Sequence, residues 1–306
     1  MKLIKKTMII PAVSLLLLSG CASRVSQFKD FGEAGVLYAD TMNALLHESG
    51  GVSIDASSAS LINHRSGAII GDDGKVKESD ASKAYQELKE SDKIIANRLR
   101  ILNDIAEHNE LLKLYFKALA DLAGSNAGTE IAVGTTGIVN ELSKLNPRIS
   151  KATLGNAPIG SLVGPVTELA VASFQQATLE KELKAHAQTI EGELELQVAA
   201  MKEVAALWKD AQETIIAGNR KIYQKQFFKD KVLPGNWAAN RKAVLIDSNS
   251  VELADSVKEA PEKLKKAFET LVSKPDKVKL EEIPLIVNDL NKVLYLIELV
   301  KKGPSV

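Results

Sequence analysis

The dominant regular feature of the sequence is an apolar repeat over residues 80–123. Its apolar positions alternate in steps of three and four, the spacing at which side chains share one face of an α-helix. At 1.5 Å per residue, a helix of this length extends for about 65 Å. Its apolar stripe must be covered by other helices along most of that length. The stripe consists of Leu88, Ile95, Leu102, Ile105, Leu112, Phe116 and Leu119, with Asn109 at one heptad position.

A second long helix is predicted over residues 167–228, where the same three-and-four spacing continues. Because one chain joins the two long helices, we expect them to pack against each other as an antiparallel pair. Heptad patterns also pack between chains, so the sequence leaves the oligomeric state open.

Shorter helices are predicted before and after this pair. The first covers residues 28–50 and ends at Gly50-Gly51, because paired glycines are typical of a helix C-terminus. A short capped helix then covers residues 55–62, and the glycine- and aspartate-rich residues 66–77 form a loop.

The C-terminal part of the chain also predicts helices. Residues 231–249 break the helical period and indicate a turn. Helices are then expected over residues 251–273 and 283–302, the latter with Pro284 in its first turn and lysines at its end.

Composition favours the same fold class. Aromatic residues make up only 5% of the chain, whereas hydrophobic residues make up 45% and charged residues 25%. With a single cysteine the chain forms no internal disulfide, so its stability must come from packed apolar surface. We therefore predict an all-α fold, an elongated helical bundle built on two long antiparallel coiled-coil-like helices, with residues 28–306 as one domain.

The N-terminus has the three parts of a bacterial export signal: a lysine-containing start, an apolar middle at residues 8–18, and small residues before a cleavage site. The apolar middle is shorter than the roughly 20 residues that a membrane-spanning helix needs. It ends beside Cys21, the only cysteine of the chain. The sequence Leu18-Ser19-Gly20-Cys21 resembles the lipobox of bacterial lipoproteins.

This resemblance implies that residues 1–20 are removed as a signal peptide. It also implies a diacylglyceryl group on the Cys21 thiol and an N-acyl chain such as palmitate on the new amino terminus. Two or three acyl chains, at about 0.8 kcal/mol per buried CH₂, hold a protein firmly to a membrane. Residues 21–27 then form a short lipidated tether. The alternative interpretation is an uncleaved N-terminal anchor with Cys21 unmodified.

By resemblance to Gram-negative lipoproteins, Ala22 directly after the cysteine implies the outer membrane, facing the periplasm. In a Gram-positive host the same anchor would lie on the outer face of the cell membrane. Removal of the signal leaves 36 basic and 39 acidic residues, a balance that does not favour nucleic acid as a partner.

An unusual segment separates the two long helices. Residues 131–174 contain five charged residues and five glycines, with no charge between Lys151 and Glu168. We expect an amphipathic helix that ends before Pro147, inside an apolar, glycine-containing insertion at residues 125–166. Small apolar residues suit close helix packing, conformational change or lipid contact. A part of the core, a partner-binding patch and a membrane-inserting head are therefore three interpretations of this segment.

Two long helices flanking a glycine-containing apolar hairpin resemble the layout of α-helical pore-forming toxins of the cytolysin A type. In those toxins an apolar head inserts into a target membrane, which implies, as an alternative function, insertion of residues 131–174 into a bilayer. The residues expected to contact a partner or a membrane are Ile159, Leu162, Val163, Val166 and Trp237.

Catalytic and metal-binding motifs are missing from the sequence. It has no Gly-x-Ser-x-Gly, its four histidines form no His-Glu-x-x-His pair, and Asp72-Asp73-Gly74 lacks the ligand spacing of a calcium loop. We expect no catalytic residue, no metal and no cofactor other than the lipid on Cys21. His186 lies on the apolar face of the second long helix, so burial is expected to lower its pKa and make it sensitive to pH.

These patterns together predict a non-enzymatic lipoprotein of the cell envelope. Its helical body would act as a scaffold, a spacer or a partner-binding module. The expected partners are a membrane, through the lipid, and a protein of the envelope. Trp208 and Trp237 are predicted to belong to the core, with an exposed anchor at a surface as the alternative for Trp237.

Overall fold

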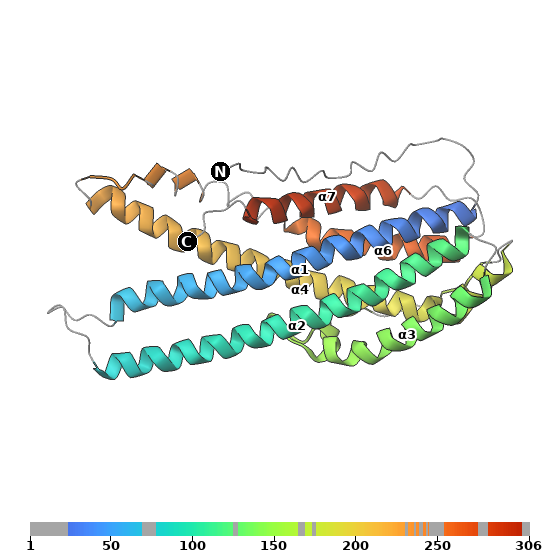
Figure 1. The fold of residues 1–306 in the computed structure, drawn as a ribbon, viewed down its shortest axis with the longest axis horizontal. Coiled ribbons are helices and arrows are strands. Elements are labelled where there is room, and N and C mark those ends of the chain that lie inside the picture. Colours follow the sequence, from blue (N-terminus) through green and yellow to red (C-terminus); the bar gives the residue numbers. More distant parts are fainter. Residues whose placement is uncertain are drawn as a thin grey trace, which may run out of the picture.

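Six α-helices and one 3-10 helix make up the described part of the chain, and no β-strand occurs there (Figure 1). The computed structural model describes residues 24–68, 78–124, 128–164, 169–172, 176–229, 254–274 and 281–301, with short stretches between 232 and 244. The helices are α1 (Arg24–Ala68), α2 (Glu78–Gly124), α3 (Gly128–Lys151), η1 (Ile159–Leu162), α4 (Ala177–Lys229), α6 (Asp255–Ser273) and α7 (Glu282–Lys301). The predicted all-α fold is confirmed.

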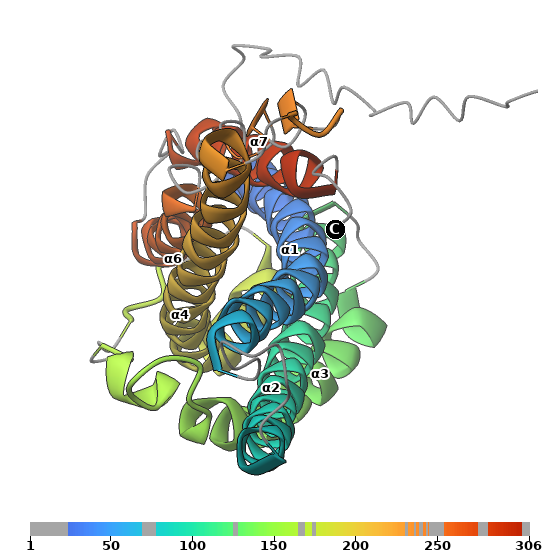
Figure 2. The ribbon, with the colours of Figure 1, turned by 90° about the vertical axis from the view of Figure 1, so that its left-hand side faces the viewer.

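The bundle is elongated, and its longer helices run roughly along one axis (Figure 1). Figure 2 looks along this axis and shows α1 between α2 on one side and α4, α6 and α7 on the other. One continuous cluster of buried apolar side chains draws on all six α-helices. Trp208 is fully buried in it, as predicted.

Helix α1 is longer than the sequence suggested. It continues through Gly50 and Gly51 and includes the short helix that was expected as a separate element. A glycine inside a helix costs about 1 kcal/mol relative to alanine. Beyond the glycines, however, Val52 and Ala56 are buried, so packing offsets that cost and the helix does not end. The prediction of a helix end at Gly50-Gly51 is therefore wrong.

Helix α2 packs mainly against α1, not against α4 as the sequence suggested. Two glycines of α1 allow this close approach. A Cβ atom on Gly32 would lie 2.6 Å from the Phe116 carbonyl oxygen, and a Cβ on Gly35 would overlap the Phe116 ring. Helices α2 and α4 make far less contact with each other, although His108 of α2 reaches Glu193 of α4. The two longest helices therefore do not form the predicted direct pair along their length.

Helix α3 lies against α2 and α4. It was expected to end before Pro147, but it continues to Lys151 with the proline inside. Proline removes one backbone hydrogen bond of a helix. The helical turn after Pro147 nevertheless forms, because Ile149 is fully buried in the core.

The remaining boundaries lie close to the predicted ones. Helix α2 begins and ends within two residues of the expected range, and α7 within one. Helix α4 ends within one residue of its predicted end but begins only at Ala177, because residues 169–172 are not helical. Most of the expected turn at residues 231–249 lies outside the described residues.

Two hydrogen bonds show which helix ends lie together at one end of the bundle. Arg24, the first residue of α1, donates a hydrogen bond of 2.7 Å from its guanidinium to the carbonyl oxygen of Leu271, near the end of α6. Gln176, just before α4, donates to the carbonyl of Leu122 in the last turn of α2. The start of α1, the end of α2 and the start of α4 are therefore at one end, and the end of α4 is at the other (Figure 1).

Candidate functional site

Cys21 and the rest of the predicted lipobox precede the first described residue. Val166, one of the expected contact residues, also lies outside the described residues. For these positions the sequence-based expectations stand as predictions.

The structure places Ile159 in the core. Its side chain is fully buried, and its backbone N–H donates a 2.8 Å hydrogen bond to the carbonyl oxygen of Ala152. In this conformation Ile159 has no exposed surface, and its expected role as a contact residue stays a prediction. Leu162 and Val163 are half-buried and pack against the same core.

Trp237 does not lie near those residues. Residues 155–164 pack beside the middle of α4, where the Gly164 N–H donates a 2.8 Å hydrogen bond to the Glu195 carboxylate. Trp237 instead packs at the end of α4, with its ring centroid 5.4 Å from that of Phe227. The described members of the expected contact set, Ile159, Leu162, Val163 and Trp237, therefore belong to two separate regions.

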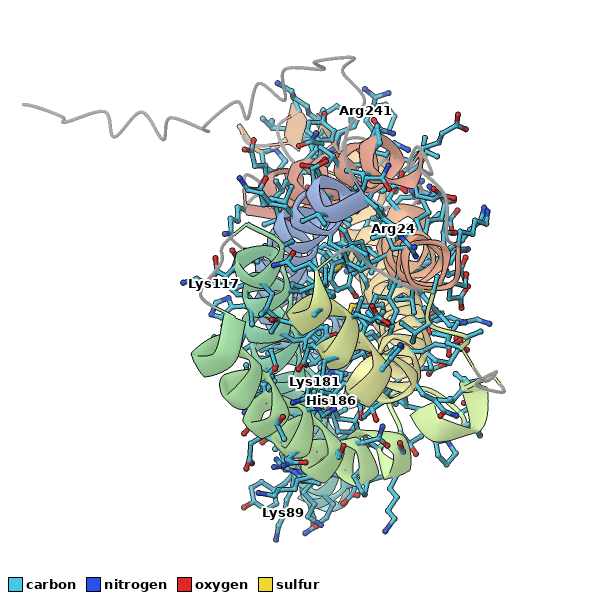
Figure 3. The ribbon with its side chains drawn as sticks, turned by 90° about the vertical axis from the view of Figure 1, so that its right-hand side faces the viewer. Arg24, Lys89, Lys117, Lys181, His186 and Arg241 are labelled. Carbon is cyan, nitrogen blue, oxygen red and sulfur yellow. The ribbon has the colours of Figure 1, made fainter. Side chains whose placement is uncertain are left out.

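His186 is only partly buried, contrary to the expectation for a residue on the apolar face. It lies between α3 and α4, where its Nε2 is 3.3 Å from the Thr136 hydroxyl and 3.9 Å from a carboxylate oxygen of Glu182 (Figure 3). Glu182 is itself buried, and burial raises its pKa, while a hydrogen bond from Thr135 and the nearby His186 act in the opposite direction. The pH sensitivity of His186 stays a prediction.

The fully buried histidine is His108 of α2. Its Nε2 lies 2.9 Å from a carboxylate oxygen of Glu193 in α4, and its Nδ1 lies 2.6 Å from the side-chain nitrogen of Gln197, one turn further along α4. Tyr38 of α1 donates a 3.2 Å hydrogen bond to the Gln197 amide oxygen, and Asn146 of α3 donates one of 3.1 Å to Glu193. This buried polar network (Tyr38, His108, Asn146, Glu193 and Gln197) joins four helices.

Donors and acceptors in this network fix one protonation pattern. Burial raises the pKa of the Tyr38 hydroxyl far above its ordinary value, so Tyr38 donates to the Gln197 oxygen. The Gln197 nitrogen carries only donors, so Nδ1 of His108 accepts. Nε2 therefore carries the hydrogen of a neutral imidazole and donates to Glu193.

No sequence pattern directly indicated this network. His108 belongs to no recognisable motif, and Glu193 lies in a stretch of alternating charges, a pattern typical of an exposed helix face. Asn109, at a heptad position beside His108, was the one polar signal inside the apolar stripe. It is fully buried as well.

A histidine beside a carboxylate is a common arrangement for acid–base chemistry. The partners of His108, however, are the side chains of neighbouring helices, and both it and Glu193 are buried. A groove of about 760 Å³ is lined by residues of α1 and α2, and His108 is not among them. The groove is lined by Asn43, Leu46, His47, Glu48, Gly50, Gly51, Ile54, Leu99, Leu102, Asn103, Ala106, Glu107 and Glu110.

Metal-ligating side chains do not cluster in groups of three or more within the part of the chain that the structure describes. Over those same residues, no helix has both the length and the hydropathy needed to cross a bilayer. No protein-family model, curated protein or solved structure matches the chain.

Proposed function

We propose that the chain is a non-enzymatic lipoprotein of the cell envelope whose helical bundle serves as a spacer or binding scaffold. In this proposal Cys21 carries the lipid, and the protein is held at the outer membrane of a Gram-negative bacterium, facing the periplasm. The observation that carries the proposal is the position of the start of α1 at one end of an elongated bundle (Figure 1).

The predicted lipid anchor on Cys21 is only a few residues from that end of the bundle. Cys21 lies three residues before Arg24, whose side chain is fixed to the end of α6 by its hydrogen bond to Leu271. A lipid on Cys21 would therefore hold this end of the bundle close to a membrane. Helix α4 has 53 residues, and a straight helix of that length extends for about 80 Å. An elongated body of this kind supports a role as a spacer.

The interior of the bundle supports a scaffold better than a catalyst. Polar groups in the core hydrogen-bond across helices, as His108 does with Glu193 and Gln197. Such networks fix the register of packed helices. The proposal accordingly gives His108 a structural role and assigns no substrate.

The test is replacement of Cys21 by serine in the full chain, expressed in a Gram-negative host that processes lipoproteins. The serine variant should keep its signal peptide, fail to incorporate labelled palmitate, and leave the outer-membrane fraction. Ala22→Asp is the matched control, because it should keep the lipid but change the membrane that retains the protein. Unchanged processing, mass and fractionation of Cys21→Ser would show that the proposal is wrong.

The alternative, insertion of residues 131–174 into a bilayer, has no observation that favours it. Leu142, Ile149 and Ile159 already lie in the core, so insertion would first have to remove them from it. Release of a trapped dye from liposomes by the unlipidated protein would support insertion, and intact liposomes would count against it.

A further inference from the structure

A cluster of exposed apolar side chains lies where α4 ends. Phe228 and Val232 are 81% and 83% exposed, the highest values among the large apolar side chains of the described residues. Phe227 and Leu233 are 53% and 39% exposed beside them. Apolar side chains exposed together in this way indicate an interaction surface rather than scattered surface residues.

The aromatic rings in this cluster pack against one another. Phe227 and Phe228 meet edge to face with ring centroids 5.3 Å apart, and Trp237 lies tilted against Phe227 at 5.4 Å. The Trp237 backbone N–H donates a 2.9 Å hydrogen bond to the Pro234 carbonyl, which closes the turn that returns the chain to α4. The rings are therefore held together at the surface and not dispersed.

Positive charge surrounds the rings. Residues 220–242 contain seven lysines and arginines and one aspartate, whereas the whole chain has equal numbers of basic and acidic residues. The basic side chains that the structure describes are all exposed, and none forms an ion pair with a described residue. They are Arg220, Lys221, Lys225, Arg241 and Lys242.

Some basic residues elsewhere on the bundle are neutralised by carboxylates. Lys263 and Lys265, for example, are each paired with two carboxylates. The stretch at the end of α4 has seven basic residues and one aspartate, and its described basic side chains pair with no described carboxylate, so it forms a local positive surface on a chain that is neutral as a whole. We call this surface the basic aromatic tip: Phe227, Phe228, Val232, Leu233 and Trp237 with Arg220, Lys221, Lys225, Arg241 and Lys242.

From this combination we infer that the basic aromatic tip binds the surface of an anionic lipid bilayer. Tryptophan and phenylalanine partition into the boundary between headgroups and acyl chains, and lysine and arginine are attracted to anionic headgroups. Val232 and Leu233 distinguish this partner from a nucleic acid, because aliphatic side chains enter hydrocarbon but do not stack on bases. The tip therefore offers both kinds of contact that an anionic bilayer accepts.

The position of the tip relative to the predicted lipid anchor determines what lipid binding there would do. It lies at the end of the bundle opposite to Arg24, where the predicted anchor begins (Figure 1). Lipid binding by the tip does not require a lipid on Cys21 and goes beyond the proposed function. If both hold, the bundle contacts lipid at each end and separates two membrane surfaces by its own length.

Vesicle binding tests the inference on the chain from residue 24 to residue 306, which keeps every described helix. Vesicles of phosphatidylcholine alone are compared with vesicles that contain about 30% phosphatidylglycerol. We expect binding at least about tenfold tighter to the anionic vesicles, and loss of that preference in concentrated salt. Equal binding to both vesicle types, or no binding to either, would overturn the inference.

Tryptophan fluorescence locates the contact. The chain has two tryptophans, and Trp208 is buried in the core, so a blue shift on vesicle addition reports Trp237. The shift should persist in Trp208→Phe and disappear in Trp237→Phe. A shift that survives in Trp237→Phe would place the contact elsewhere and overturn the inference.

Matched pairs of variants test whether vesicles bind to the tip or to another apolar part of the surface. Phe228→Ser with Val232→Ser should weaken anionic-vesicle binding about tenfold or more, because both side chains are almost fully exposed and their loss leaves the core intact. Tyr295→Ser with Leu285→Ser removes apolar groups that are 56% and 49% exposed on α7 and should change binding little. Equal losses in the two pairs would overturn the inference.

The charged part of the tip has its own control. Arg241→Glu with Lys242→Glu should reduce binding to anionic vesicles, whereas Lys83→Glu with Lys89→Glu on α2 should not. Helical content and melting temperature are measured for each variant, so that misfolding is recognised. Binding to a DNA duplex in place of vesicles would show that the lipid assignment is wrong. The Cys21→Ser experiment remains independent, because the vesicle assay uses unlipidated protein.

Discussion

His108 of α2 and Glu193 of α4 form a hydrogen bond of 2.9 Å, and their side chains are 0% and 5% exposed. This bond joins α2 and α4, which otherwise make little contact with each other. Gln197 and Asn146 add donors on either side, so the pair connects three helices. A charged group in such a position has no water to replace a lost partner.

Replacement of His108 by leucine should therefore destabilise the bundle by about 3 kcal/mol, because Glu193 loses a partner and Gln197 loses its acceptor. The free energy of unfolding in urea measures this change. His47→Leu is the control, since the His47 side chain is 89% exposed and its removal should change stability by less than about 0.5 kcal/mol.

The double variant His108→Leu with Glu193→Leu should recover part of the loss, because apolar side chains of similar volume remove the buried charge together with its partner. A double-mutant cycle gives the coupling free energy. Strictly additive losses would mean that the two residues do not stabilise each other.

Gly35→Ala should destabilise the α1–α2 contact by about 1–3 kcal/mol, because the added methyl group overlaps the Phe116 ring. Gly51→Ala in the same helix is the matched control. A Cβ there meets no atom within 4 Å, so the higher helix propensity of alanine should stabilise the protein by up to about 1 kcal/mol. Similar effects at the two positions would contradict the close packing of α1 on α2.

Glu191 is buried, and one of its carboxylate oxygens has no hydrogen-bond partner among the described residues. Burial raises the pKa of Glu191 above its ordinary value, Glu269 and Glu195 raise it further, and Lys265 lowers it. A raised carboxyl pKa favours the folded state most at low pH, and this stabilisation is lost as the pH rises through the folded-state pKa.

Glu191→Gln should therefore be more stable than the parent at pH 7, and its advantage should shrink as the pH falls toward the unfolded-state pKa of glutamate, about 4.3. Urea unfolding at both pH values measures the difference. Glu90→Gln is the control, because the Glu90 side chain is 65% exposed and pairs only with exposed Lys93. A constant advantage at both pH values would contradict the assigned cause.

Asp104 of α2 is buried and bonded to Arg148 of α3 and, at 3.4 Å, to Arg100. Arg148→Ala should cost about 1–3 kcal/mol, because it removes the stronger partner of a buried carboxylate. Lys144→Ala on the same helix removes an exposed pair with Glu141 and should cost less than about 1 kcal/mol. Thermal unfolding compares the two, and equal costs would contradict the bridging role of Arg148.

The two tryptophans should differ in access to solvent without any ligand present. In Trp237→Phe only Trp208 remains, so emission should be blue-shifted and resistant to acrylamide. In Trp208→Phe the remaining Trp237, which is half-buried, should be quenched more readily. Equal quenching would contradict the position of Trp237 at the surface.

The sequence alone predicted the all-α fold and the ends of α2 and α7, because helix periodicity and helix caps are local properties. It also singled out Trp237, although not Phe227 and Phe228 beside it. The neighbouring aromatic pair inside a lysine-rich stretch was the available signal for those two residues.

Only the tertiary structure decided which helices meet. The apolar stripe of a helix must be buried, but its sequence does not specify which helix buries it. Helix α2 packs on α1 because Gly32 and Gly35 leave room for Phe116. Packing also carried α1 through Gly50-Gly51 and α3 through Pro147, where local preference favours a break. Burial of His108 and Glu193 together depended on that choice of partners, since residues 85 positions apart become neighbours only after the helices pack.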